Sequence, residues 1–253
     1  DLAGGLRGAP VELVKCETLD LEVPATSEIV LEGMVLPGER RPEGTFGEFT
    51  GYNAGAKHPR PVFRIQCITH RKNPIFTMCN PGKPWEENDT VFAIATSATL
   101  WNELKARGIP FSSVYVMPPG TAVMVATKSQ YVGYAHTVAS AIWCSKGGVS
   151  KSYIFVVDED VDVTDPEDLL WCLTTRLHPQ RGIHVQESTV GNPLSPFLSR
   201  EEKRDGMAAR VLFDATFPYN WSAEERPTVI DLEHGWPPEI SEKVLGRWEA
   251  YGI

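Results

Sequence analysis

The sequence predicts a mixed α/β (α+β) protein, and three observations support this class. The chain of 253 residues contains 21 glycines and 20 prolines, and so many turn formers favour strands joined by turns over a helical bundle. Short segments of alternating apolar and polar residues, typical of half-buried strands, occur in the first third. The continuous apolar run at 153–157 is typical of a strand buried on both faces of an α/β sheet.

Residues 1–86 have the pattern of a β-rich domain. Apolar and polar residues alternate in three segments: 11–16, 28–32 and 62–68. The pattern stops between 34 and 61, which predicts a long irregular segment. A loop of that length inside a compact domain is usually functional or disordered, and its aromatic side chains argue against disorder.

Residues 87–215 alternate between helical and strand patterns, as expected for an α/β layer domain. Helices are expected at about 89–105, at 131–145 and from Asp165 onward, and strands at 113–117, 121–127, 153–157 and 183–187. Asp165 and Pro166 form a helix start, because an Asp side chain caps free N–H groups and proline fits the first helical position. The tail, 216–253, is expected to end in a helix over 239–250 that packs on a partner subunit. The apolar side of this helix consists of Ile240, Val244, Leu245 and Trp248.

Charge, hydropathy and cysteine content argue against several classes of protein. The net charge of −9 argues against a nucleic-acid binder, which needs clustered cations. No apolar stretch approaches the roughly 18 residues of a membrane span. The five cysteines contain no CxxC pair, which favours reduced thiols and a cytoplasmic location.

The most informative segment is 42–52 (PEGTFGEFTGY). Glu43 and Glu48 lie five residues apart, and three glycines make the chain pliable enough for both carboxylates to face one cleft. A carboxylate pair in an aromatic setting suits general acid catalysis. From composition alone, the alternative is a pair of solvated loop acids.

Other patterns point away from metal and hydrolase chemistry. The acids at 158–162 lack the glycine and distal glutamate of an EF-hand, so we expect loop caps there and no metal ligands on this chain. The six histidines show no zinc-ligand spacing. No nucleophile elbow, Walker loop or dinucleotide fingerprint follows a strand.

Four motifs in this order resemble the UbiD-type decarboxylases: 28–33 (EIVLEG), 42–52, 69–71 (THR) and 158–162 (DEDVD). The resemblance runs from Leu2 to about Trp221. It implies that 1–86 is the C-terminal part of a split-barrel flavin-binding domain, that 87–215 is an α/β domain, and that 216–253 is a tail with an oligomerisation helix. The implied activity is reversible non-oxidative decarboxylation of an aromatic or α,β-unsaturated carboxylic acid by a homo-oligomer that uses prenylated FMN.

The resemblance also implies residue roles. Glu48 would protonate the carbon that has lost CO2, and Glu43 would pair with an active-site arginine. Lys151 would contact the cofactor phosphate, with an exposed lysine at a strand entrance as the alternative. Three apolar residues would line the substrate pocket, with ordinary packing as the alternative: Phe49, and Phe197 and Leu198 of a mobile loop.

In the family, the arginine partner and the ligands of a divalent metal (manganese or magnesium) lie N-terminal to the matched region, and potassium is a further candidate ion. We therefore expect these ligands upstream of residue 1, on an N-terminal half that is a separate chain or part of a longer polypeptide. Two other functions stay open: a non-catalytic assembly subunit of a multi-subunit carboxylase, and another enzyme, either a different carboxylate-pair lyase or one of cofactor maturation.

Overall fold

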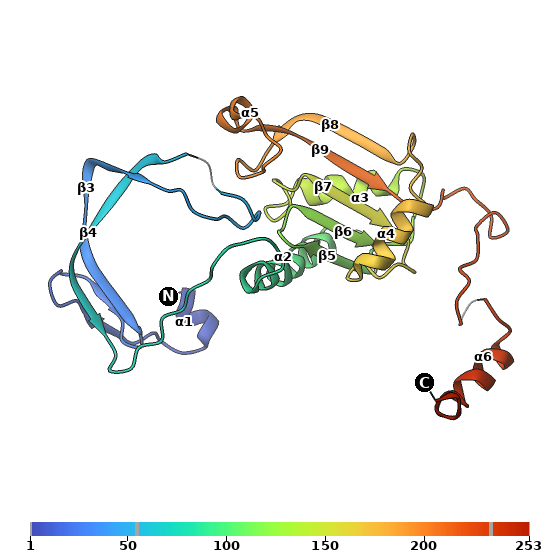
Figure 1. Ribbon diagram of the computed structural model, residues 1–253, viewed down its shortest axis with the longest axis horizontal. Helices are drawn as coiled ribbons and strands as arrows, with labels where there is room; N and C mark the ends of the chain where they lie inside the picture. Colours follow the sequence, from blue (N-terminus) through green and yellow to red (C-terminus); the bar gives the residue numbers. More distant parts are fainter. Residues whose placement is uncertain (1, 54–55, 233–234, 253) are drawn as a thin grey trace. The chain divides into compact units, whose positions relative to one another are not determined.

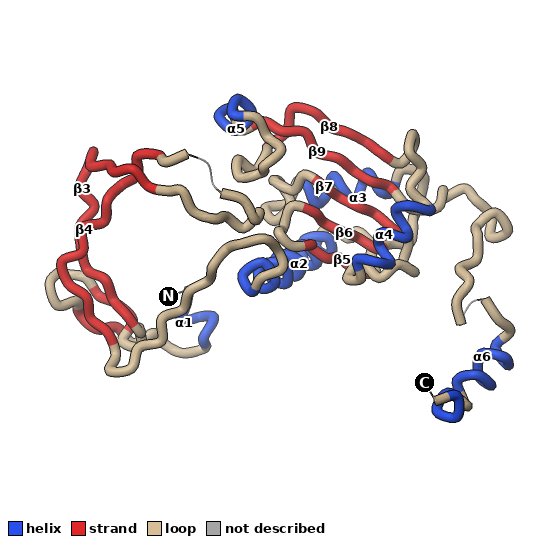
Figure 2. The backbone as a smooth tube through the Cα atoms, viewed as in Figure 1, coloured by secondary structure: helices blue, strands red, loops and turns tan. Residues whose placement is uncertain are grey.

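The computed structural model describes residues 2–53, 56–232 and 235–252. Helices and strands are both present, which confirms the mixed α+β class (Figure 2). The chain divides into two compact units, one with residues 1–92 and 193–203, the other with 93–192 and 204–253. Each unit is described by itself. The boundaries at 87 and 216 stay predictions.

The first unit is built on hairpins. It contains helix α1 (Leu2–Arg7) and four strands: β1 (Leu13–Lys15), β2 (Glu22–Pro24), β3 (Ile29–Glu43) and β4 (His58–His70). Strands β1 and β2 pair antiparallel, and β3 and β4 form a long antiparallel ribbon (Figure 1). The described residues of this unit form no closed barrel.

The ribbon corrects one expectation, because 34–43 and 58–61 are strand and not loop. The ladder jumps from the pair Val35–Phe63 to the pair Arg40–Pro61, so the residues between Val35 and Arg40 bulge out of the pairing. Every strand of a two-stranded ribbon is an edge, which tolerates proline and irregular pairing. The prolines and glycine of 37–42 therefore led to the prediction of a loop where the chain forms a strand.

A buried carboxylate joins the two hairpins. Glu32 accepts N–H hydrogen bonds from Glu17 and Thr18, each 2.8 Å long, and one of 2.6 Å from the Thr18 hydroxyl. These bonds lower the pKa of Glu32. At the next residue, a Cβ on Gly33 would lie 2.1 Å from the Arg64 carbonyl oxygen, so only glycine fits this close approach of the strands.

The first unit has almost no apolar core. Among the described residues from 2 to 86, the two buried ones are Glu32 and Thr50, and both are polar. Large apolar side chains of the ribbon are instead exposed: Leu31, Met34, Val35, Leu36, Phe63, Ile65 and Ile68. A ribbon of this kind does not bury enough apolar surface to be stable alone.

The second unit is a five-stranded sheet with the order β5-β6-β7-β9-β8. Its strands are β5 (Ser113–Met117), β6 (Ala122–Ala126), β7 (Tyr153–Val157), β8 (Ile183–Val190) and β9 (Met207–Asp214). Strands β6, β7 and β9 are parallel, and β5 and β8 pair antiparallel at the two edges. The predicted central strand at 153–157 is confirmed, whereas the sequence pattern gave no indication of β9.

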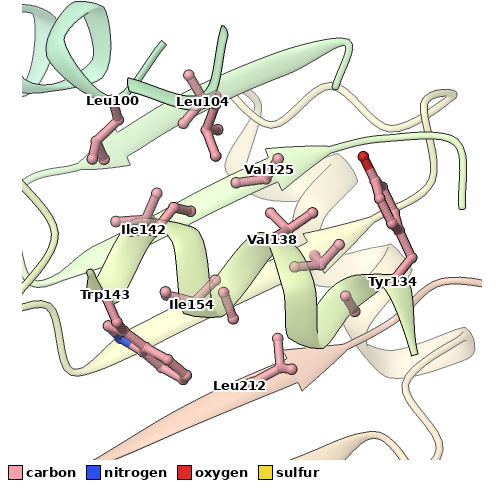
Figure 3. Packing of buried hydrophobic residues seen from close by; sticks show 14 of the residues in the cluster. Leu100, Leu104, Val125, Tyr134, Val138, Ile142, Trp143, Ile154 and Leu212 are labelled. Carbon is pink, nitrogen blue, oxygen red and sulfur yellow. The ribbon is translucent and has the colours of Figure 1, made fainter. Parts of the chain in front are cut away.

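Helices cover both faces of this sheet. Successive residues of a strand point to opposite faces, so Val123 and Val125 of β6 lie on one face and Met124 and Ala126 on the other. The first face packs against α2 (Glu87–Ala106) and α3 (Tyr134–Trp143), as Figure 3 shows. The second face packs against α4 (Pro166–Thr175). The sheet is therefore a rigid base for the loops at its two ends.

Short helices complete the chain. They are α5 (Arg200–Asp205), α6 (Pro238–Leu245) and a 3₁₀ turn (Trp248–Tyr251). The expected C-terminal helix is thus present, although it is interrupted at Gly246. Ile240, Leu245 and Trp248 on its apolar side are exposed. None of the helices in the described ranges has the length and apolar character needed to cross a bilayer.

Candidate functional site

Glu43 is the last residue of β3, and its Cα pairs with that of His58. Its Oε2 lies 3.9 Å from Nε of Arg60 on the facing strand. Both side chains are largely exposed, so this ion pair is weak. The ribbon thus ends in an acid that already has a cation beside it.

Glu48 lies in a tight turn. Its backbone N–H donates to the Tyr52 carbonyl (2.9 Å), and the Gly51 N–H donates to the Glu48 carbonyl (2.8 Å). Gly51 has φ of 78°, and a Cβ there would lie 2.9 Å from Cα of Lys83, so the turn requires glycine. Glu48 and Phe49 are half-buried. The turn therefore fixes the backbone from which the Glu48 carboxylate projects.

The segment around Phe197 belongs to the same unit as the acid loop. Phe197 is about half exposed (50%), whereas Leu198 is buried and donates its N–H to the Ser195 carbonyl (3.3 Å). The Ser195 hydroxyl is buried and has no hydrogen-bond partner among the residues that the structure describes. The sequence pattern did not single out Ser195, because a lone serine carries no motif.

Lys151 lies in the second unit, two residues before β7. It is buried, which contradicts the alternative of an exposed lysine and lowers the pKa of its ammonium group. Its Nζ donates to the Gly120 carbonyl, and Nε1 of Trp143 donates to the Lys151 carbonyl (2.9 Å). Lys151 is therefore held by its side chain and by its backbone.

The acidic cluster at 158–162 caps loops, as predicted. Asp162 accepts from the N–H and the hydroxyl of Thr164, at 2.8 and 2.7 Å. Asp158 accepts from the Phe217 N–H (2.8 Å), and burial raises the pKa of Asp158 to about 6. Arg176 binds Asp160 through two hydrogen bonds of 2.8 and 2.7 Å. The sequence did not reveal Arg176, because its partner lies 16 residues away.

The predicted site residues are divided between the two units. Glu43, Glu48, Phe49, Phe197 and Leu198 belong to one compact unit, and Lys151 belongs to the other. A buried ammonium group with three N–H donors suits a phosphate. In the part of the chain that the structure describes, no group of three or more His, Cys, Asp or Glu side chains could hold a metal ion. The acids thus suit proton transfer, and Lys151 suits anion binding.

Two family models match successive parts of the chain. Residues 1–84 match the Rift-related domain of 3-octaprenyl-4-hydroxybenzoate carboxy-lyase (UbiD), and residues 89–215 match its C-terminal domain. The chain belongs to the UbiD family. The motifs of the UbiD family that the sequence analysis named lie inside these two matches.

UbiD relatives match the chain over most of its length. Phenolic acid decarboxylase of Sedimentibacter hydroxybenzoicus is 38% identical over 250 residues, which are 96% of this chain and 51% of the relative. The structure of the UbiD-class enzyme HmfF from Pelotomaculum thermopropionicum in complex with FMN has a TM-score of 0.78 at 31% identity, covering 98% of this chain and 53% of HmfF.

An evolved dimeric form of HmfF in complex with prFMN has a TM-score of 0.68 at 30% identity, covering 90% of this chain and 48% of that protein. The chain thus spans about half the length of the proteins that it matches.

Proposed function

We propose that this chain is the proton-donating part of an enzyme that reversibly decarboxylates an aromatic or α,β-unsaturated carboxylic acid without oxidation. The observation that carries the proposal is the acid loop of a UbiD-family chain, in which a glycine-dependent turn fixes the backbone at Glu48. A proton donor must be held within hydrogen-bond reach of the reacting carbon, and a fixed turn serves this purpose.

The proposed cofactor is prenylated FMN, since an HmfF form that resembles this chain binds prFMN. When bound, this group supplies an electron sink for the electrons that remain when CO2 leaves. From this chain, Lys151 would hold its phosphate, because its positively charged side chain is buried and its backbone is held by Trp143.

The remaining roles belong to side chains of the first unit. Glu48 donates the proton to the carbon that has lost CO2, and in the carboxylation direction it accepts that proton. Glu43 pairs with an arginine of the active site, and the proximity of Arg60 Nε to its Oε2 (3.9 Å) supports its use as a partner for a cation. Phe49, Phe197 and Leu198 pack on the ring or double bond of the substrate and exclude water from the proton path.

The proposed partner corresponds to the half of the UbiD relatives that this chain does not cover. We call it the second body, whether it is a separate chain or part of a longer polypeptide. The uncovered apolar side chains of the ribbon support this proposal, because they need a packing partner. We place the arginine partner of Glu43 and the ligands of a manganese or magnesium ion, with potassium as a further ion, on that second body.

We further propose that the whole assembly is a homo-oligomer and that the exposed apolar side of α6 takes part in its contacts. A reduced cytoplasmic location is also proposed, and the five free cysteines support it.

A Glu48→Gln substitution tests the proton-donor role. The variant is prepared with the second body and prenylated flavin, and incorporation of deuterium from D2O into the decarboxylated products of 4-hydroxybenzoate and related aromatic acids is measured. We expect a loss of about 100-fold or more with the flavin absorbance retained, because the amide has no acidic proton to give. Glu12→Gln, an exposed acid outside the loop, is the control and should keep full activity.

The same variant separates the alternative functions. An assembly subunit, which the uncovered ribbon also favours, would show unchanged turnover in Glu48→Gln. Activity without any dependence on prenylated flavin would favour a different carboxylate-pair lyase.

A further inference from the structure

The second unit contains a pocket of about 190 Å³ that the proposed function does not use. Three segments line it: the loop after β6 with the first turn of α3, the loop between α4 and β8, and the segment that follows β9. We call it the edge pocket, because it lies where parallel strands β6 and β9 end. Lys151 lies at the opposite edge, beyond the roughly 16 Å length of β7. Clefts outside the carboxyl ends of parallel strands are common ligand sites.

The edge pocket contains one cation without an acidic partner. Arg176 is neutralised by its two hydrogen bonds to Asp160. Arg181 also lines the pocket, and within the described ranges no carboxylate pairs with it. Its guanidinium carbon lies 5.9 Å from the centre of the Trp221 ring. The pocket therefore offers a charge that suits a single anionic group.

His178 adds a directional donor. Its Nδ1 accepts N–H hydrogen bonds from Gln180 and Arg181, both 3.2 Å long. The neutral ring must then carry its hydrogen on Nε2, so this residue of the pocket lining has an N–H donor at Nε2. Two donors that line one pocket, Nε2–H of His178 and the Arg181 guanidinium, can bind the two oxygens of one carboxylate.

An acceptor lies on the other side of the pocket. Asp214 ends β9, and its Oδ1 accepts from the N–H (3.1 Å) and the hydroxyl (2.7 Å) of Thr216. Its Oδ2 has no hydrogen-bond partner in the described parts of the chain, and a ligand hydroxyl could donate to it. A second anionic group on the ligand would meet this carboxylate, so the pocket suits a monoanion with a hydroxyl donor.

Size and lining indicate a single ring. An apolar cavity of about 150 Å³ in another protein holds benzene, so 190 Å³ is enough for one substituted ring. Three tyrosines line the pocket, Tyr131, Tyr134 and Tyr219, and the first two pack edge to face with ring centres 5.1 Å apart. Tyrosine rings offer the faces and edges on which an aromatic ligand packs.

We propose that the edge pocket binds a single-ring hydroxylated aromatic carboxylate. Its carboxylate binds Arg181 and Nε2–H of His178, its ring packs on the tyrosines, and its hydroxyl donates to Asp214. The proposal goes beyond the decarboxylation chemistry, because it rests on the charges and size of this pocket. It gives the second unit a site at which compounds of the proposed substrate class bind away from Lys151.

Isothermal titration of the 253-residue chain with 4-hydroxybenzoate tests this proposal. We expect saturable binding that weakens by about tenfold or more in Arg181→Ala, the effect of removing a charge-assisted hydrogen bond. The control is Arg204→Ala, which removes an exposed arginine that pairs with Asp205 and does not line the pocket. This titration uses neither the second body nor the flavin, so the outcome of the activity test of Glu48 does not decide it.

A second variant tests the pocket independently, in case Arg181→Ala does not fold. Ser129→Trp fills the edge pocket and keeps every charge, and it should also weaken binding while the far-ultraviolet circular dichroism and the midpoint of thermal unfolding stay native. No saturable binding to the wild-type chain, or equal affinity in Arg181→Ala, overturns the proposal. Equal affinity for phenol excludes the carboxylate contact, and equal affinity for inorganic phosphate excludes the ring contact, so either result also overturns it.

Discussion

At the scale of single residues, Asp158 gives the clearest dependence on pH. Its carboxyl group has a pKa of about 6 because of burial, above the value of 3.8 for an unperturbed aspartate. The folded state therefore binds this proton more tightly, so its stabilising effect is complete below about pH 4 and is lost as the pH rises to about 6. The loss is on the order of 3 kcal/mol.

We therefore predict that the free energy of unfolding of the wild type, minus that of Asp158→Asn, decreases between pH 4 and 6 and is constant above pH 6. Urea unfolding followed by tryptophan fluorescence measures this difference, since six of the seven tryptophans belong to the second unit. Asp162 is the opposite case, because hydrogen bonds to Thr164 lower its pKa. The free energy of unfolding of the wild type minus that of Asp162→Asn should therefore rise with pH. A difference for Asp158→Asn that does not change between pH 4 and 6 would contradict the prediction.

The sequence marked the chemically distinctive residues but not their surroundings. Glu48 stands out because of the acids and glycines around it, and Lys151 stands out through the resemblance to the UbiD family. The burial of Lys151, the contact of Trp143 with its carbonyl and the pairing of Arg176 with Asp160 depend on how separate segments fold together. Such contacts leave no periodic pattern in the chain.

At the scale of secondary-structure elements, helix α4 was predictable in detail. Asp165 Oδ1 accepts the Glu167 N–H at 2.9 Å, and proline occupies the first helical turn. Asp165→Ala should lower the free energy of unfolding of the second unit by about 1 kcal/mol, because an N–H of the first turn loses its partner. Asp165→Ser should recover most of that loss in the same urea titration. Equal destabilisation by both substitutions would show that the cap is not the cause.

Strands β3 and β9 show the limit of local patterns. Residues 207–214 (MAARVLFD) follow the charged helix α5 and begin with good helix formers, so local propensity did not indicate a strand. Their strand state comes from pairing with β7 on one side and β8 on the other. The bulged half of β3 likewise forms a strand because it pairs with β4. Its prolines argue locally against a strand, so the sequence pattern did not predict it.

At the scale of the whole molecule, the two units differ in how much apolar surface they bury. The second unit has two buried clusters, whereas the described ribbon has none. We predict that amide hydrogens of β7 in the isolated chain exchange slowly, and that those of β4 exchange within seconds to minutes and become protected when the second body is supplied. Slow exchange in β4 without that partner would contradict the prediction. A flavin spectrum with stoichiometric metal from the chain alone would contradict the proposed need for a second body.

The hydrogen bond from Trp143 to the Lys151 carbonyl has an experimental consequence. The indole ring is buried, lies 4.2 Å from the Arg210 guanidinium carbon, and touches the backbone of the residue that we assign to phosphate binding. Its emission is sensitive to the strength of that bond and to nearby charge. The difference between the fluorescence of the wild type and that of Trp143→Phe is thus a label-free optical reporter for the arrival of an anion at Lys151, on the time scale of rapid mixing.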